Sequence, residues 1–354
     1  MVAAPTLTVI VRSMARPSLE AALASIAVQD YAPVEVLVVA ACGPAHPALP
    51  PACGPHELLA VASPVRLPRP QAANAGLDAA TGEWITFLDD DDMFLPGHLS
   101  ALMGARAAEP QARVVHSYAR AVFRDGHVER FGQPHALIQL YERNYIHLSS
   151  AVIARDLVAA GCRFDESLEI HEDWDFFIQL AQNARFHFVA CESFEWHADA
   201  GDSGAGGGGN QDDARFAAYR DRVYAKWAAR RDALVERVGP LVEQAAALAQ
   251  RGERAVAEEC CREALQASPS DPWVLNVLAM IRNAAGDLRE ARAAQELAVA
   301  IRPLDPGLVY NLAVLCRAQG DVELARRCCD RALALAPGFA PAQKLATELG
   351  AALE

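Results

Sequence analysis

Four consecutive aspartates, Asp89–Asp92, are the residues of this sequence best suited to metal chemistry. Neighbouring carboxylates repel one another unless a cation or water screens their charge. A hard divalent ion binds carboxylate oxygens and shares its remaining coordination positions with phosphate groups. Most charge runs are solvated turns, but this one directly follows the apolar stretch Trp84–Leu88 and precedes Pro96. That position favours a site for a divalent metal ion and a nucleotide.

A second acidic segment places Glu172 and Asp173 among large aromatic residues, in the run His171–Phe177. Acids are common in the first turn of a helix, where the dipole favours negative charge, so a plain helix start is the simpler interpretation. Aromatic neighbours, however, make a drier site in which a carboxylate can act as a general base. Trp196-His197 is a third candidate, although a lone histidine is more often structural than a ligand.

These side chains need a scaffold, and the N-terminal half predicts alternating strands and helices. We expect strands at Leu7–Val11, Val34–Val39 and Trp84–Leu88, and helices at Leu19–Val28 and Asn74–Ala80. The β-α-β order predicts a parallel sheet with helices on its faces. Because ligands of such sheets bind beyond the carboxyl ends of the strands, the acidic run lies where a ligand is expected.

Three stretches of the sequence, taken together and in order, resemble the inverting glycosyltransferases of family 2. They are residues 7–39 (LTVIVRSMARPSLEAALASIAVQDYAPVEVLVV), 67–96 (LPRPQAANAGLDAATGEWITFLDDDDMFLP) and 161–181 (GCRFDESLEIHEDWDFFIQLA). The resemblance covers about residues 6–200. It implies an α/β domain with the GT-A fold, the Rossmann-like fold of nucleotide-diphospho-sugar transferases.

The resemblance also implies a role for each matching residue, a nucleoside-diphosphate sugar as donor, and Mn²⁺ or Mg²⁺ as cofactor. The implied donor-nucleotide contacts are Arg12, Arg69, Asn74, Asp89 and Asp90; the implied metal ligands are Asp91, Asp92 and His197; the implied base is Asp173, with Glu172 beside it. The metal would neutralise charge on the departing nucleoside diphosphate. The base would take a proton from an acceptor hydroxyl that attacks the anomeric carbon from the opposite face, which inverts that centre.

Two positions depart from the family pattern. The run Ala40-Ala41-Cys42 follows the second strand, where an acid that contacts the nucleotide base is usual, and Ser13 and Ala15 stand where threonine or asparagine is usual. The donor nucleotide therefore stays open. The alternative hypothesis is a repeat-based interaction protein whose transferase domain is a degenerate sensor of sugar nucleotides.

The C-terminal part repeats with a period of 34 residues. The positions that share this period are Gly252, Gly286 and Gly320; Ala257, Ala291 and Ala325; Ala264, Ala298 and Ala332; and Pro269, Pro303 and Pro337. Glycine permits the turn between two helices, alanine lets helices approach closely, and proline ends the second helix. The pattern resembles the tetratricopeptide repeat, with units at 238–271, 272–305 and 306–339 and a capping helix at 340–354.

Tetratricopeptide arrays commonly bind peptides or proteins in the groove lined by the first helix of each unit. By this analogy the groove residues are Trp273, Asn276, Met280, Asn283, Tyr310, Asn311 and Arg317. The alternative is that the array only packs against the enzyme domain or forms a dimer. The doublets Cys260-Cys261 and Cys328-Cys329 occupy equivalent repeat positions, which favours helix packing over metal binding.

These features divide the chain into a transferase domain at 1–209, a connecting helix at 210–237 and a repeat domain at 238–354. The glycine-rich stretch Gly201–Asn210 has the composition of a flexible segment, either a bare linker or a lid over the donor. The sequence does not name the acceptor, which could be a glycan, a lipid-linked glycan or a protein.

Composition excludes several classes of partner and site. The 354 residues carry a formal net charge of -13, which gives no attraction for nucleic acid. No apolar run of 18 residues and no signal peptide is evident, and the nine scattered cysteines include no CxxC pair. We therefore expect a protein of the reducing cytoplasm, either free or peripheral to the inner face of the membrane.

Overall fold

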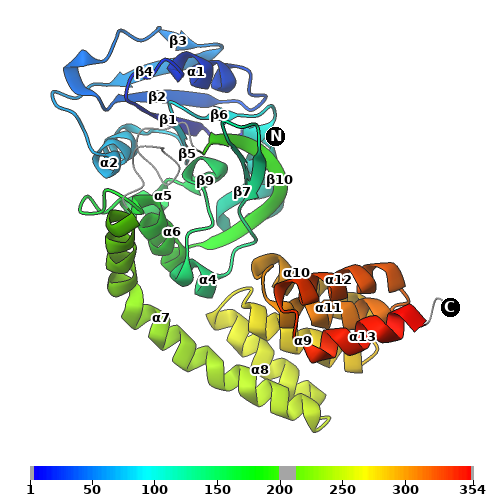
Figure 1. The fold of residues 1–354 in the computed structure, drawn as a ribbon. Helices are drawn as coiled ribbons and strands as arrows, with labels where there is room; N and C mark the ends of the chain where they lie inside the picture. The colour runs from blue at the N-terminus through cyan, green and yellow to red at the C-terminus, as the bar shows by residue number, and fades with distance from the viewer. Residues whose placement is uncertain (1–3, 199–212, 352–354) are drawn as a thin grey trace. The chain divides into compact units, whose positions relative to one another are not determined.

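The computed structural model describes residues 4–198 and 213–351, which belong to two compact units. The first unit extends to Trp227 apart from the segment Pro134–Gln139, and the second contains that segment and the chain from Ala228 onward. The first unit is built on a β-sheet and the second is helical (Figure 1). The predicted lid or linker at Gly201–Asn210 lies outside the described residues.

A ten-stranded sheet forms the centre of the first unit. Its strands are β1 (Leu7–Ser13), β2 (Val34–Ala40), β3 (Ala52–Cys53), β4 (His56–Val61), β5 (Trp84–Asp89), β6 (Met93–Phe94), β7 (Ala112–Val122), β8 (Val128–Phe131), β9 (Ala151–Ala154) and β10 (Arg185–His197). They lie in the order β3-β4-β2-β1-β5-β9-β7-β10-β6, with β8 paired to β7. Because β4, β2, β1 and β5 run parallel, their carboxyl ends meet at one edge, and the predicted GT-A-like α/β class is confirmed.

The three predicted strands are β1, β2 and β5, and each extends one or two residues beyond its predicted end. Their side chains are buried almost throughout, as central parallel strands require. The register places Arg12 of β1 directly beside Asp89 of β5. The ends of these two strands therefore bring a basic and an acidic side chain together.

The helices of the first unit cover the sheet (Figure 1). They are α1 (Leu19–Ala27), α2 (Arg69–Ala79), α3 (His98–Ala108), α4 (Leu137–Glu142), which begins in the short segment of the second unit, α5 (Asp156–Ala159) and α6 (Glu172–Asn183). Helix α2 begins five residues before the predicted start, because Pro70 in its first turn favours helix initiation. Gly76 lets α2 lie close to β1, since a Cβ there would come within 2.3 Å of Ile10 Cγ2.

The second unit is a stack of helix pairs with the predicted period. It comprises α8 (Arg254–Ala267), α9 (Pro272–Ala284), α10 (Leu288–Ile301), α11 (Pro306–Ala318), α12 (Val322–Leu335), α13 (Ala340–Ala351) and the second half of α7 (Asp213–Gln250). Gly252, Gly286 and Gly320 adopt φ values of 78°, 84° and 78°, a left-handed turn that suits glycine. The repeated alanines are completely buried where helices cross.

The expected boundary between a connecting helix and the first repeat helix is not a break in the structure. Helix α7 runs continuously from Asp213 to Gln250, with Pro240 inside it. Alanine is frequent on both sides of the proline, with arginine before it and leucine and glutamine after it, and these strong helix formers carry the helix through it. The two units therefore share one helix, divided after Trp227.

The cysteine doublets lie inside α8 and α12 rather than at a metal site. Cys261 and Cys329 are buried, and burial raises the pKa of both thiols to about 11. Neutral thiols of this kind pack as small apolar groups. Over the described ranges, no helix has the length and apolarity needed to cross a bilayer.

Candidate active site

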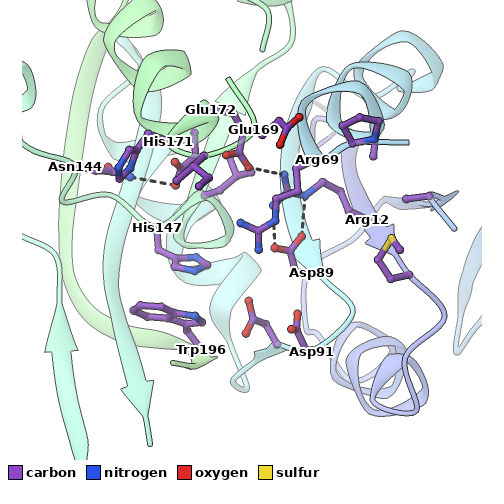
Figure 2. A pocket seen from close by; sticks show the side chains of 18 of the residues that line it. Arg12, Arg69, Asp89, Asp91, Asn144, His147, Glu169, His171, Glu172 and Trp196 are labelled. Carbon is purple, nitrogen blue, oxygen red and sulfur yellow. Dashed lines mark hydrogen bonds and ion pairs between the residues drawn. The ribbon is translucent and has the colours of Figure 1, made fainter. Parts of the chain in front are cut away.

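A cavity of about 920 Å³ opens at the carboxyl ends of β1 and β5 (Figure 2). Its walls come from the loop after β1, the start of α2, the turn after β5, the segment before β9, the start of α6 and the end of β10. Eight predicted site residues line it: Arg12, Arg69, Asp89, Asp91, Asp92, Glu172, Asp173 and His197. The fold thus gathers residues more than 180 positions apart in the chain into one site.

Asp89, Asp91 and Asp92 form a compact acidic group, with one oxygen from each within 4.8 Å of the others. Burial, followed by repulsion from Asp89, raises the pKa of Asp91 and raises that of Asp92 further. Three close carboxylates supply the oxygen donors that a hard divalent cation prefers. The donor set therefore fits Mn²⁺ or Mg²⁺.

Arg12 joins the two acidic sides of the cavity. Its Nε and Nη2 donate to the two oxygens of Asp89 at 2.7 and 2.8 Å, and its Nη1 lies 3.3 Å from Glu172 Oε1. Burial alone would raise the pKa of Asp89, but the charge and hydrogen bonds of Arg12 outweigh it and hold that pKa at about 2. Arg12, which we predicted to contact the donor nucleotide, is thus already paired with two carboxylates.

Asp90 belongs to the acidic run but does not line the cavity. Its fully buried carboxylate accepts hydrogen bonds from Ser13 Oγ (3.0 Å), Met14 N (2.7 Å) and Arg16 Nη1 (2.5 Å). These bonds fix the loop after β1 to the turn after β5. Asp90 therefore has a structural role, since its oxygens are occupied, and its expected nucleotide contact stays a prediction.

Asn74 likewise lies away from the cavity. It is buried in α2, where its amide donates to Phe164 O at 3.0 Å and accepts from Phe164 N at 3.1 Å. This pair of bonds ties α2 to the chain that leads into α6. Asn74 thus has a structural role, and its expected contact with the donor nucleotide stays a prediction.

Asp173 and Glu172 open α6 at the other side of the cavity. Asp173 accepts a hydrogen bond from Asn144 Nδ2 at 3.0 Å and one from Trp174 N at 2.7 Å. Burial raises the pKa of both carboxyl groups, although Arg69 and Arg12 oppose the rise in Glu172. A buried carboxylate whose pKa is raised toward neutrality is a suitable proton acceptor.

Comparison with known proteins assigns the first unit. Residues 8–146 match the model of the family described as glycosyl transferase family 2. The chain carries a family 2 glycosyltransferase domain. Residues 306–339 match the tetratricopeptide repeat model, which confirms the prediction for the third repeat. The family 2 match contains the acidic group and ends before α6.

Two bacterial relatives support this assignment. An uncharacterized glycosyltransferase, YwdF of Bacillus subtilis, is 32% identical over 165 residues, which is 44% of this chain and 59% of the relative. The succinoglycan biosynthesis protein ExoO of Rhizobium meliloti is 30% identical over 173 residues, 44% of this chain and 49% of the relative. The chain thus spans only about half to three fifths of these relatives.

A solved structure has a similar fold. A fragment of TarS from S. aureus, in complex with UDP-GlcNAc, aligns with a TM-score of 0.50 at 16% sequence identity. The alignment covers 89% of this chain and 92% of the fragment.

His197 supports the acidic turn of the family 2 domain. Its Nδ1 lies 2.8 Å from the carbonyl oxygen of Asp91, and its main-chain nitrogen donates to Asp92 Oδ1 at 3.2 Å. Within the part of the chain that the structure describes, the group of close metal-binding atoms comprises three aspartates and does not include this ring. His197 therefore holds two candidate ligands in place, and its own ligation stays a prediction.

The start of α7, up to Trp227, belongs to the first unit and is more than a connection. Lys226 Nζ (2.9 Å) and Trp227 Nε1 (2.8 Å) both donate to the buried carboxylate of Asp175, two residues after Asp173 in α6. Near its start, α7 also contributes Phe216 to the cavity wall. Sequence periodicity cannot show such contacts, because they join elements some 50 residues apart.

We expect Lys226→Met to lower the free energy of unfolding by about 1–3 kcal/mol, because Asp175 would keep its buried charge and lose a charged partner. Urea unfolding followed by circular dichroism measures the change. Lys344, an exposed lysine of α13, offers a matched control whose substitution by methionine should shift the midpoint little. Equal stability of the two variants would contradict the proposed anchoring of α6 by α7.

Sequence reasoning missed three residues of the site: Arg16, Asn144 and His147. Arg16 lies 3.6 Å from Asp91, Asn144 bonds to Asp173, and His147 lies on the cavity wall beside Trp196. Burial lowers the pKa of His147 to about 4. The polar residues of Asn144–Ser150, placed just before an apolar strand, were the signal available.

Proposed function

We propose that the family 2 domain transfers a sugar from a nucleoside-diphosphate sugar to an acceptor hydroxyl, with inversion at the anomeric carbon. The observation that carries this proposal is one cavity that contains both the three close aspartates and the pair Glu172 and Asp173 at the start of α6. The three aspartates suit a metal-bound diphosphate, and the pair Glu172 and Asp173 suits an acceptor hydroxyl.

In this proposal Asp173 accepts the proton of the acceptor hydroxyl, and Asn144 holds its carboxylate in place. Arg12 and Arg69, both on the cavity wall, attract the anionic donor and offset its charge. A divalent ion bound by the acidic group would supply further neutralisation of the departing diphosphate. One displacement then inverts the anomeric carbon.

The direct test is release of nucleoside diphosphate from a panel of sugar nucleotides with Mn²⁺ present. UDP-GlcNAc is the first donor to try, because the TarS fragment of similar fold binds it. We expect metal-dependent slow hydrolysis of at least one donor. A failure of every donor to bind or react would favour the second candidate, an interaction protein with a degenerate domain. Ala41 favours that candidate, because it lines the cavity after β2, where the family usually has an acid.

The repeats, in our proposal, recruit the acceptor or a protein partner. Several predicted groove residues are already used in packing: Asn276 bonds to Asn311 at 2.7 Å, Tyr310 packs edge-on against Phe339, and Arg317 pairs with Glu348. Trp273 and Met280 remain 41% and 49% exposed, and they are the largest apolar side chains that α9 offers to a ligand. Asn283 is partly buried on the same helix.

Substitution of Trp273 and Met280 together by alanine should slow transfer to the natural acceptor and leave donor hydrolysis unchanged. Exposed apolar side chains can be shortened with little loss of stability, so the effect should report on binding. Kinetics with each substrate in turn measures the difference. Normal acceptor kinetics in this variant would exclude acceptor recruitment through α9.

A further inference from the structure

The ring of His147 is held in one orientation by its own main-chain neighbourhood. His147 precedes the short 3-10 helix Leu148–Ser150, and its Nδ1 accepts a hydrogen bond from Ser149 N at 3.2 Å. The carbonyl oxygen of His147 also accepts from Ser150 N at 3.0 Å and Ser150 Oγ at 2.8 Å. A ring nitrogen that accepts a hydrogen bond carries no proton, so the ring is neutral and Nε2 is its donor.

Aromatic residues of β10 hold the same ring against the cavity. Phe194 lies 4.6 Å and Trp196 5.2 Å from it, measured between ring centroids, and the interplanar angles are 33° and 41°. Figure 2 shows His147 and Trp196 facing Asp89 and Asp91 across the cavity. Nδ1 of His147 forms a hydrogen bond, whereas Nε2 forms none with residues 4–198 and 213–351. An aromatic wall thus presents one neutral N–H group to the cavity.

His147 lines the same cavity as two functional regions, and these indicate what it contacts. One is the acidic group with the cations Arg12 and Arg69, where the diphosphate is expected. The other is Asp173, which is held by Asn144 from the same segment as His147. The part of a donor that lies between its diphosphate and the acceptor hydroxyl is the sugar being transferred.

The chemistry of the group fits a sugar better than a phosphate. Charged arginines bind phosphate oxygens more strongly than a neutral N–H does, and five of them line the cavity. A neutral hydrogen-bond donor beside an aromatic side chain suits a sugar, because a sugar ring carries hydroxyl groups and also has an apolar face. Building on the proposed transferase function, we infer that His147 donates a hydrogen bond from Nε2 to a hydroxyl of the transferred sugar.

Two substitutions separate the two ring nitrogens. Asparagine is short, so His147→Asn keeps an acceptor for Ser149 N near Nδ1 and leaves no donor at the position of Nε2. Glutamine is longer, so His147→Gln places an amide N–H near Nε2. Calorimetry with Mn²⁺ would compare UDP-GlcNAc and UDP on the full-length wild type and both variants. If the wild type prefers another member of a UDP-, GDP- and dTDP-sugar panel, that sugar nucleotide and its own nucleoside diphosphate replace the pair.

We expect His147→Asn to weaken binding of the sugar nucleotide by about three- to tenfold, the range of one neutral hydrogen bond, and to leave binding of the nucleoside diphosphate unchanged. His147→Gln should retain most of the affinity. Equal losses for both ligands would overturn the inference in favour of a diphosphate contact. Equal losses in both variants, together with a lower unfolding midpoint, would overturn it in favour of packing alone, and unchanged affinity in His147→Asn would overturn it outright.

The wild type distinguishes a failure of the proposed function from a failure of this inference. A wild-type chain that binds neither nucleoside diphosphates nor sugar nucleotides would remove both. A wild-type chain that binds them, with variants that do not discriminate the sugar, would remove the role of His147 and leave the transferase function standing.

Discussion

Asp173→Asn is expected to lower turnover by about 10²–10⁴-fold, the usual contribution of a general base, while donor affinity stays near the wild-type value. Asparagine has nearly the same shape as aspartate, and its one amide oxygen can take the place of Oδ1, which accepts from Trp174 N at the start of α6. The hydrogen bond from Asn144 to Oδ2 is lost, because an amide nitrogen cannot accept it. What is also lost is the negative charge that accepts the proton. Steady-state kinetics of transfer and calorimetry with the donor measure the two quantities separately.

The pH dependence of turnover gives an independent check on Asp173. Burial raises the pKa of this carboxyl group. Because a base must be deprotonated to act, turnover should fall as pH drops through that raised value, above the ordinary aspartate pKa of about 3.9. The acid limb should disappear in Asp173→Asn. A loss below tenfold there, with a large loss in Glu172→Gln, would transfer the role to Glu172.

Asp91→Asn should abolish metal-dependent nucleotide binding while the fold remains intact. Groups that only support metal ligands typically account for 10- to 100-fold in affinity, so loss of a ligand should exceed about 100-fold. Calorimetry with nucleoside diphosphate in the presence and absence of Mn²⁺ is the measurement. Near wild-type affinity in this variant would refute the metal assignment of the acidic group.

The direction in which Asp91→Asn changes the free energy of unfolding can also be predicted. Burial and the neighbouring Asp89 raise the pKa of Asp91, so near pH 7 its ionised form costs free energy in the folded state relative to the unfolded chain. Removing the charge should therefore keep or increase the metal-free unfolding free energy. Asp90→Asn is the matched control. It should lower that free energy, because the carboxylate of Asp90 holds the loop after β1 through hydrogen bonds from Ser13, Met14 and Arg16.

The parallel half of the sheet could be predicted from the sequence, because buried parallel strands leave continuous apolar runs. The antiparallel strands β7 and β9 could not, because their register depends on contacts between distant segments. The tetratricopeptide repeats were visible in the sequence, since a 34-residue period in four position classes is stronger than any single motif.

The candidate site was predictable as a set of segments and less so as a set of side chains. The run Asp89–Asp92 indicates a cation site, yet only the folded turn shows that Asp90 points into the protein and its neighbours into the cavity. The burial of Asn74 could not be predicted for the same reason, because the direction of a side chain on α2 depends on where the helix packs. His147 lay outside every motif, since its role comes from one bond to Ser149 and from the walls around it.

Arg12 gives the cavity a property that none of its carboxylates has alone. One guanidinium shares its charge between Asp89 at the end of β5 and Glu172 at the start of α6. A charge that arrives or leaves at either acid therefore changes the free energy of ionisation of the other. The two sides of the cavity are thus thermodynamically linked, and a titration of this site measures the connected set rather than a single group.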